Sequence, residues 1–93
     1  MAVRTEVFSS GRYRIELHED YHGFAEVPRQ PGADELCIWI NPRLRGKQRL
    51  ETIIHEAIHA EWPDMPEQKV EAAGTNIGRL VWRLGYRAQR AKP

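Results

Sequence analysis

A run of apolar residues at helical spacing between residues 47 and 61 constrains the fold more than any other feature of the sequence. Its apolar members are Leu50, Ile53, Ile54, Ala57 and Ile58. Because an α-helix turns by about 100° per residue, side chains three and four positions apart line one side of it. This side must be covered, and a chain of 93 residues supplies only one modest hydrophobic core. We therefore expect a single domain, residues 1–93, organised around this helix.

The chain before this helix has the pattern of strands and turns. Residues 12–18 alternate between polar and apolar side chains, which predicts a strand with one buried face. Residues 24–27 predict a weaker strand that ends at Pro28, and residues 29–34 are a turn-rich loop. Residues 36–40 are apolar on both faces and are followed by Asn-Pro. They are the strongest strand in the sequence.

A second helix is predicted from about Met65 to Leu84, after a proline-containing break. Asp64 is a candidate N-cap and Gly85 a candidate stop. The residues expected to be buried on this helix are Val70, Gly74, Ile77, Val81 and Leu84. Strands followed by two helices predict an α+β fold. We expect a small N-terminal sheet of about three strands packed on the first helix, with the second helix at the C-terminus.

Composition excludes several classes of protein. The net charge is +1 with a pI near 8.0, and 41% hydrophobic and 29% charged residues are ordinary for a globular domain. The single cysteine, Cys37, excludes an internal disulfide framework and favours a reducing compartment. The N-terminus lacks the apolar core of a secretion signal, and no apolar run approaches membrane-spanning length. We expect a cytoplasmic protein with no membrane partner, and the sequence leaves its oligomeric state open.

The first helix carries two histidines on the side opposite its apolar residues. His55-Glu56-Ala57-Ile58-His59 has the HExxH pattern, in which both imidazoles reach the same point from consecutive turns. The pattern is typical of zinc hydrolases, whose glutamate acts on a metal-activated water. We therefore predict Zn²⁺ as the cofactor, His55 and His59 as its ligands, and Glu56 as the general base that hydrolyses a peptide bond. The alternative is a pair of solvated histidines on the polar side of an amphipathic helix.

A hydrolytic zinc site usually has three protein ligands and an open position for water. Candidates for the third ligand are Glu61, Asp64, Glu67, Glu71, His18 and His22. We favour Glu67, because a second helix that folds back would present it to the imidazoles. Glu71, one turn further on, is predicted to accept a hydrogen bond from a ligand imidazole or to exchange roles with Glu67. Two plainer interpretations stay open: Glu67 forms a capping box with Asp64, and Glu71 is a surface carboxylate.

Residues 51–60, the following proline-containing turn and residues 67–71 together resemble small zincin-type metallopeptidases of phages and prophages, which are distantly similar to SprT-like proteins. The resemblance covers about residues 36–84. It implies a minimal zincin-like fold, with His55, His59 and Glu67 as zinc ligands and Glu56 as the catalytic glutamate. The chain departs from larger relatives, because it lacks the longer ligand spacing of thermolysin-like enzymes, the glycine and third histidine of metzincins, and a separate substrate-binding domain.

Two other functions compete with a peptidase acting on a peptide or protein. The first is a catalytically inactive zincin-like adaptor module, although a structural zinc would normally have four protein ligands. The second is association with nucleic acid, because the C-terminal end is basic. Its cations are Arg79, Arg83, Arg87, Arg90 and Lys92. The net charge of +1 disfavours this function, and cations at a helix C-terminus also favour the helix dipole.

Substrate binding is expected to involve the strand at residues 36–40. If this strand lies at a sheet edge, it can hold an extended peptide by strand addition. Its two apolar faces equally allow a place in the middle of the sheet.

Overall fold

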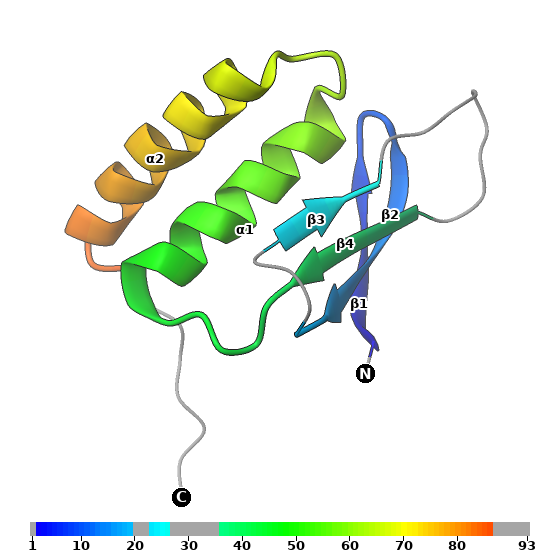
Figure 1. Ribbon diagram of the computed structural model, residues 1–93, viewed down its shortest axis with the longest axis horizontal. Helices are drawn as coiled ribbons and strands as arrows, with labels where there is room; N and C mark the ends of the chain where they lie inside the picture. The colour runs from blue at the N-terminus through cyan, green and yellow to red at the C-terminus, as the bar shows by residue number, and fades with distance from the viewer. Residues whose placement is uncertain (1, 20–22, 27–35, 87–93) are drawn as a thin grey trace, which may run out of the picture.

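The computed structural model describes residues 2–19, 23–26 and 36–86, and the structural statements below concern these residues. They contain four strands and two helices (Figure 1). The strands are β1 (Ala2–Phe8), β2 (Gly11–Leu17), β3 (Gly23–Ala25) and β4 (Leu36–Ile40), and the helices are α1 (Gly46–Glu61) and α2 (Glu67–Arg83). The α+β prediction is confirmed. The expected sheet of about three strands has a fourth, β1, which the sequence pattern did not reveal.

The four strands form one mixed sheet in the order β1-β2-β4-β3. β1 pairs with β2 and β3 with β4 in antiparallel fashion, whereas β2 and β4 are parallel, with Ile15 opposite Ile38. β4 therefore lies inside the sheet, which is one of the two positions that its apolar faces allowed, and the alternative of an edge position is contradicted. The end strands are β1 and β3. The loop predicted at residues 29–34, and Val27 and Pro28, lie outside the described residues.

The core lies between the sheet and α1. Leu36, Ile38 and Ile40 of β4 point into it, because alternate side chains of a strand face the same side. Tyr13 of β2 is fully buried, and its hydroxyl donates a hydrogen bond to the carbonyl oxygen of Glu26 at 3.0 Å. Ala60 joins this cluster from the last turn of α1. The sheet thus fixes the helix that carries the histidines.

The two helices form successive layers outside the sheet (Figure 1). α1 lies between the sheet and α2, and the two helices run antiparallel. Among the described elements, α2 packs mainly against α1, so one side of α2 stays open to solvent. This open side explains a wrong prediction. Ile77 and Leu84 were expected to be buried but are exposed, whereas the buried residues of α2 are Val70 and Gly74, as expected, and Gly78. On α1, Ile58 is buried as expected but Ile53 is exposed.

α2 differs from the prediction at its N-terminal end and agrees with it at its C-terminal end. The helix begins at Glu67 with Pro66 as its N-cap, and no side chain caps it, so the predicted N-cap Asp64 is wrong. A proline is well suited to this end of a helix because it has no backbone N–H to satisfy. Gly85 adopts φ +94° just after the helix, as expected for a glycine stop. In the described part of the chain, neither helix is long and apolar enough to cross a membrane.

Candidate metal centre

The side of α1 that carries His55 and His59 is the starting point of the site. The two residues lie on adjacent turns, both are half-buried, and their ring centroids are 4.9 Å apart. α2 covers this side of α1, since Gly74 lies directly against His55. The alternative of two fully solvated histidines is therefore contradicted.

Glu67 completes the cluster from the first residue of α2. Its Oε1 lies 2.9 Å from Nε2 of His55, and its Oε2 lies 3.1 Å from Nε2 of His59. One ligand atom from each of the three residues lies within 4.8 Å of the other two. Because Pro66 is the N-cap and Glu67 contacts both imidazoles, the capping-box interpretation is wrong. The structure thus brings together the three residues predicted as zinc ligands.

Glu56 is buried beside this cluster, with 7% of its surface exposed. Burial raises the pKa of its carboxyl group from 4.5 to about 7, and the negative charge of Glu67 contributes to the same shift. Gly23, at the start of β3, packs against it: a Cβ atom on Gly23 would lie 2.6 Å from Oε2 of Glu56. The carboxyl group is therefore held between α1 and β3, with a pKa near neutrality.

Two glycines of α2 allow the helices to approach closely at the site. A Cβ atom on Gly74 would lie 3.3 Å from Cβ of His55, and one on Gly78 would lie 2.6 Å from Cγ of Glu51. Larger side chains at these positions would separate the helices. The glycines thus set the spacing at which Glu67 reaches both imidazoles.

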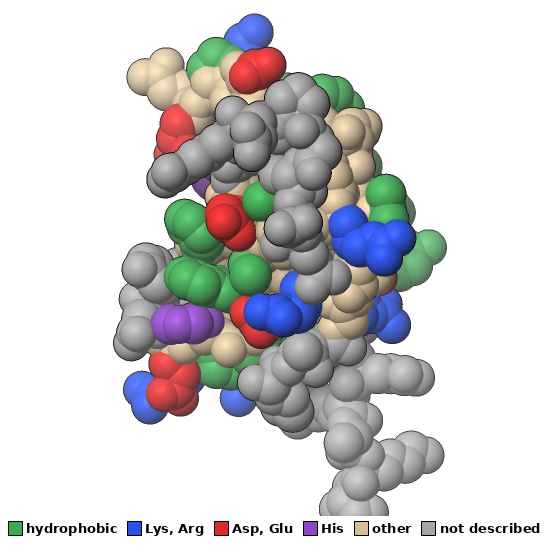
Figure 2. All heavy atoms as spheres, turned by 90° about the vertical axis from the view of Figure 1, so that its right-hand side faces the viewer, with side chains coloured by type: hydrophobic (Ala, Val, Ile, Leu, Met, Phe, Trp, Pro, Cys, Tyr) green, Lys and Arg blue, Asp and Glu red, His purple; other side chains and the backbone are tan. Residues whose placement is uncertain are grey.

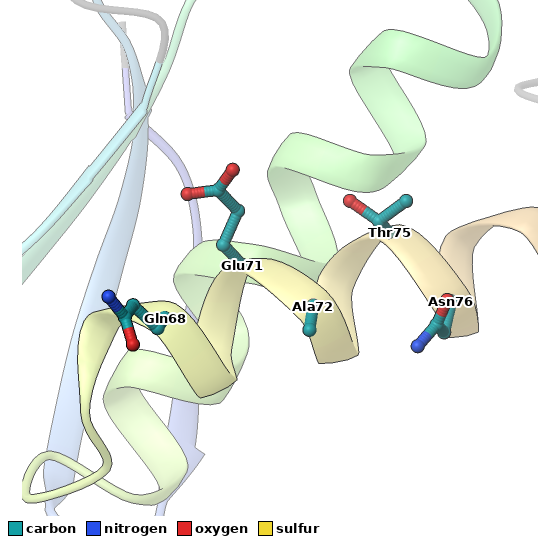
Figure 3. Close-up of a pocket in the computed structure, with 5 residues that line it drawn as sticks. All are labelled: Gln68, Glu71, Ala72, Thr75 and Asn76. Carbon is teal, nitrogen blue, oxygen red and sulfur yellow. The ribbon is translucent and has the colours of Figure 1, made fainter.

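Glu71 does not join the cluster. It is exposed and makes no hydrogen bond or ion pair with any residue in the described part of the chain. It lines a shallow hollow whose five residues all come from α2 (Figure 3). The hydrogen bond predicted from an imidazole to Glu71 is therefore not seen, and the surface-carboxylate interpretation fits this structure.

The remaining candidates for the third ligand lie elsewhere. Glu61 accepts hydrogen bonds from the backbone N–H and the hydroxyl of Ser9, which lower the pKa of its carboxyl group. His18 stacks on Trp39, with ring centroids 4.4 Å apart, and Phe24 lies on the same side of the sheet as Trp39. Figure 2, which views the sheet side of the molecule, shows hydrophobic side chains gathered beside a histidine. His22 lies outside the described residues.

Two features of the site were missed in the sequence. Gly23 was not recognised as a neighbour of Glu56, although a glycine at the start of a strand is a known sign of close backbone approach. Ser10, in the β1–β2 turn, donates a hydrogen bond to the carbonyl oxygen of Ala60 at 2.5 Å. Together with the Ser9–Glu61 contact, it attaches this turn to the last turn of α1. No local sequence signal predicts such long-range contacts.

The donor atoms of the cluster suit a metal ion. Two imidazole nitrogens and one carboxylate oxygen, converging from two helices, match the ligand types of catalytic zinc sites. Within the described residues these three form the one group with such convergent donors. Comparisons of the sequence and structure with models of known protein families, with curated proteins and with solved structures found no match.

Proposed function

We propose that this protein is a zinc-dependent hydrolase that cleaves peptide bonds. The observation that carries the proposal is the convergence of His55, His59 and Glu67, with the buried carboxyl group of Glu56 beside them. This is the arrangement expected of the HExxH pattern and of the zincin resemblance. Three ligands are found among the described residues, rather than the four of a typical structural site, and they would leave a position for water.

His55, His59 and Glu67 would hold the ion. When bound, zinc supplies Lewis-acid activation of a water molecule and of the substrate carbonyl group. The Glu67 carboxylate, which bridges the two imidazoles at 2.9 and 3.1 Å, would offer its oxygen to the ion instead. The cluster is accessible from the side of Glu67, whose side chain is 63% exposed.

Glu56 would carry the proton in this reaction. As a general base it accepts the proton of the attacking water at its carboxylate, and it then donates this proton to the leaving amine. A base is most effective when its pKa lies near the working pH, and burial already brings the pKa of Glu56 to about 7. Gly23 packs against this carboxyl group and limits its movement.

The substrate would lie along β3 rather than β4. β3 is an end strand that pairs with β4 on one side and packs against α1 beside Glu56. An extended peptide added to this end of the sheet would pass the three ligands. This moves the expected strand addition from β4, which is enclosed by β2 and β3, to its neighbour.

The test is peptide hydrolysis by the zinc-loaded chain, measured with a library of fluorescence-quenched peptides. We expect cleavage that stops when zinc is removed by a chelator and returns when zinc is restored. Glu56→Gln should lower kcat by about 10²- to 10⁴-fold while zinc stays bound, because it removes the base without removing a ligand.

The control is Glu71→Gln, which changes an exposed carboxylate on the neighbouring helix and should leave kcat unchanged. Zinc binding without cleavage of any peptide would contradict hydrolysis and favour the adaptor function. Cleavage that persists in Glu56→Gln would contradict the role of Glu56.

A further inference from the structure

α2 has an apolar seam whose C-terminal half is not covered by α1. The seam consists of Val70, Ala73, Ile77, Leu80 and Leu84, which follow one another at steps of three and four residues. Val70 is buried, but Ile77 is 45% exposed, Leu80 58% and Leu84 65%. The C-terminal half of the seam therefore presents three large aliphatic side chains to solvent.

The spacing of the seam indicates what kind of surface it fits. Alternating steps of three and four residues are the pattern by which one α-helix packs along another. α2 packs against α1 around Gly74 and Gly78, and of the seam residues only Val70 is buried with them. The exposed half of the seam is thus a second helix-packing face, in addition to the one that α1 occupies.

The charges of α2 are segregated around this seam. At about 100° per residue, Lys69 and Arg83 lie within about 60° of Leu80 around the helix axis. Both are exposed. The two acidic residues of α2, Glu67 and Glu71, lie about 140° and 180° away from Leu80, on the side of the histidines. Positive charge therefore lies towards both ends of the seam: Lys69 is next to buried Val70, and Arg83 is next to exposed Leu84. The exposed half of the seam lies away from the candidate metal centre, because Glu67 is at the opposite end of α2.

We propose that this seam binds an amphipathic α-helix with acidic flanks, supplied by a partner protein. The apolar seam would bury the partner's apolar side, and Lys69 and Arg83 would face its carboxylates. A second copy of this chain fits less well, because its own Lys69 and Arg83 would be brought against these cations. A nucleic-acid backbone would leave the leucines uncovered. The proposal does not depend on zinc or on hydrolysis.

The test uses two synthetic peptides of about three heptads each, with leucine at the a and d positions. One carries glutamate and the other lysine at the e and g positions, so each peptide repels itself and stays monomeric. Fluorescence anisotropy of each labelled peptide is measured with the full chain. We expect the glutamate peptide to bind at least about tenfold more tightly than the lysine peptide, an energy difference of about 1.4 kcal/mol.

Variants of the exposed residues locate the binding surface. Leu80→Glu should weaken binding of the glutamate peptide by at least about tenfold, with an unchanged Tm. Val7→Glu is the matched control, because Val7 is 72% exposed on β1, far from α2 in the fold, and should not affect binding. The double variant Lys69→Glu, Arg83→Glu should reverse the preference and favour the lysine peptide.

Several results would overturn the proposal. These are equal binding of the two peptides, no binding of either, or binding that Leu80→Glu leaves intact. Sedimentation of the wild type as a dimer that Leu80→Glu dissociates would assign the seam to a second copy. Binding to vesicles of phosphatidylcholine and phosphatidylglycerol, without peptide binding, would assign it to a lipid surface. The zinc content of the same samples is measured as well. It shows whether the metal site has failed, independently of the peptide-binding result.

Discussion

At the scale of single residues, the account depends on two glutamates with opposite environments. Glu67 is exposed and contacts both imidazoles, whereas Glu56 is buried against Gly23 and has a raised pKa. A carboxylate that is to bind a cation gains from being accessible and ionised. One that is to exchange a proton near neutral pH gains from burial. The two environments therefore match the ligand and general-base roles.

The raised pKa of Glu56 predicts how the stability of the metal-free protein depends on pH. The folded state holds this proton up to about pH 7, whereas the unfolded chain releases it near 4.5. The favourable contribution of Glu56 to the free energy of unfolding is therefore fully present below about pH 4.5 and is lost as the pH rises to about 7. Glu56→Gln should remove this loss and make the metal-free protein more stable at pH 8, by roughly 2 to 3 kcal/mol.

Urea denaturation of both proteins at pH 4.5 and pH 8, in the presence of a chelator, checks this prediction. The difference in the free energy of unfolding between variant and wild type should grow with pH. A difference that is the same at both pH values would show that Glu56 titrates normally in the folded state.

Gly23 is predicted to position Glu56. Gly23→Ala places a Cβ atom 2.6 Å from Oε2 of Glu56 and 2.7 Å from Cγ2 of Thr52, so the carboxyl group has to move. We expect a loss of about 1 to 3 kcal/mol in the free energy of unfolding and a fall in kcat, with zinc content unchanged. Urea denaturation, peptide hydrolysis and metal analysis on one preparation test this. An unchanged kcat would mean that β3 does not restrain Glu56.

At the scale of elements, the site depends on how closely α1 and α2 cross. His55 and His59 come from one helix and Glu67 from the other, so any separation of the helices moves these side chains apart. The start of α1 and the positions of both histidines follow from the sequence to within a residue, because they depend on local periodicity. The distance between α1 and α2 does not follow from the sequence, because it depends on which side of α2 meets α1.

The exposed seam of α2 is a second feature that the sequence pattern alone could not predict. Apolar spacing alone marks Ile77 and Leu84 as buried, because the pattern records which residues can pack but not what covers them. Similarly, β1 has polar residues that conceal its pairing with β2, and the place of β4 inside the sheet follows from long-range pairing. Local patterns predicted the candidate ligands, and tertiary packing places Glu67, but not Glu71, against the two imidazoles.

Gly74→Leu should weaken zinc binding through this crossing. The new side chain would meet His55, which a Cβ atom alone would already approach to 3.3 Å, and would push α2 outward. We expect zinc affinity to fall by at least about tenfold, measured by competition with a chromogenic chelator. Thr75→Leu is the matched control, because Thr75 is the next residue of the same helix and is exposed. Equal affinities in the two variants would contradict the role of the crossing.

At the scale of the whole molecule, a small sheet, a central helix and an outer helix form three layers that hold one cluster of donor atoms (Figure 1). A domain of 93 residues buries a limited core, so a ligand that joins two layers adds substantially to its stability. Zinc at 100 times its dissociation constant would stabilise the folded state by about 2.7 kcal/mol. Metal binding, fold stability and activity are therefore expected to change together.

The most direct test of the central claim is the zinc content of wild type, Glu67→Ala and Glu71→Ala, measured by elemental analysis after zinc is supplied and excess removed. The account predicts about one zinc per chain in wild type and in Glu71→Ala, and almost none in Glu67→Ala. Wild-type protein without zinc, or zinc lost in Glu71→Ala but kept in Glu67→Ala, would contradict it.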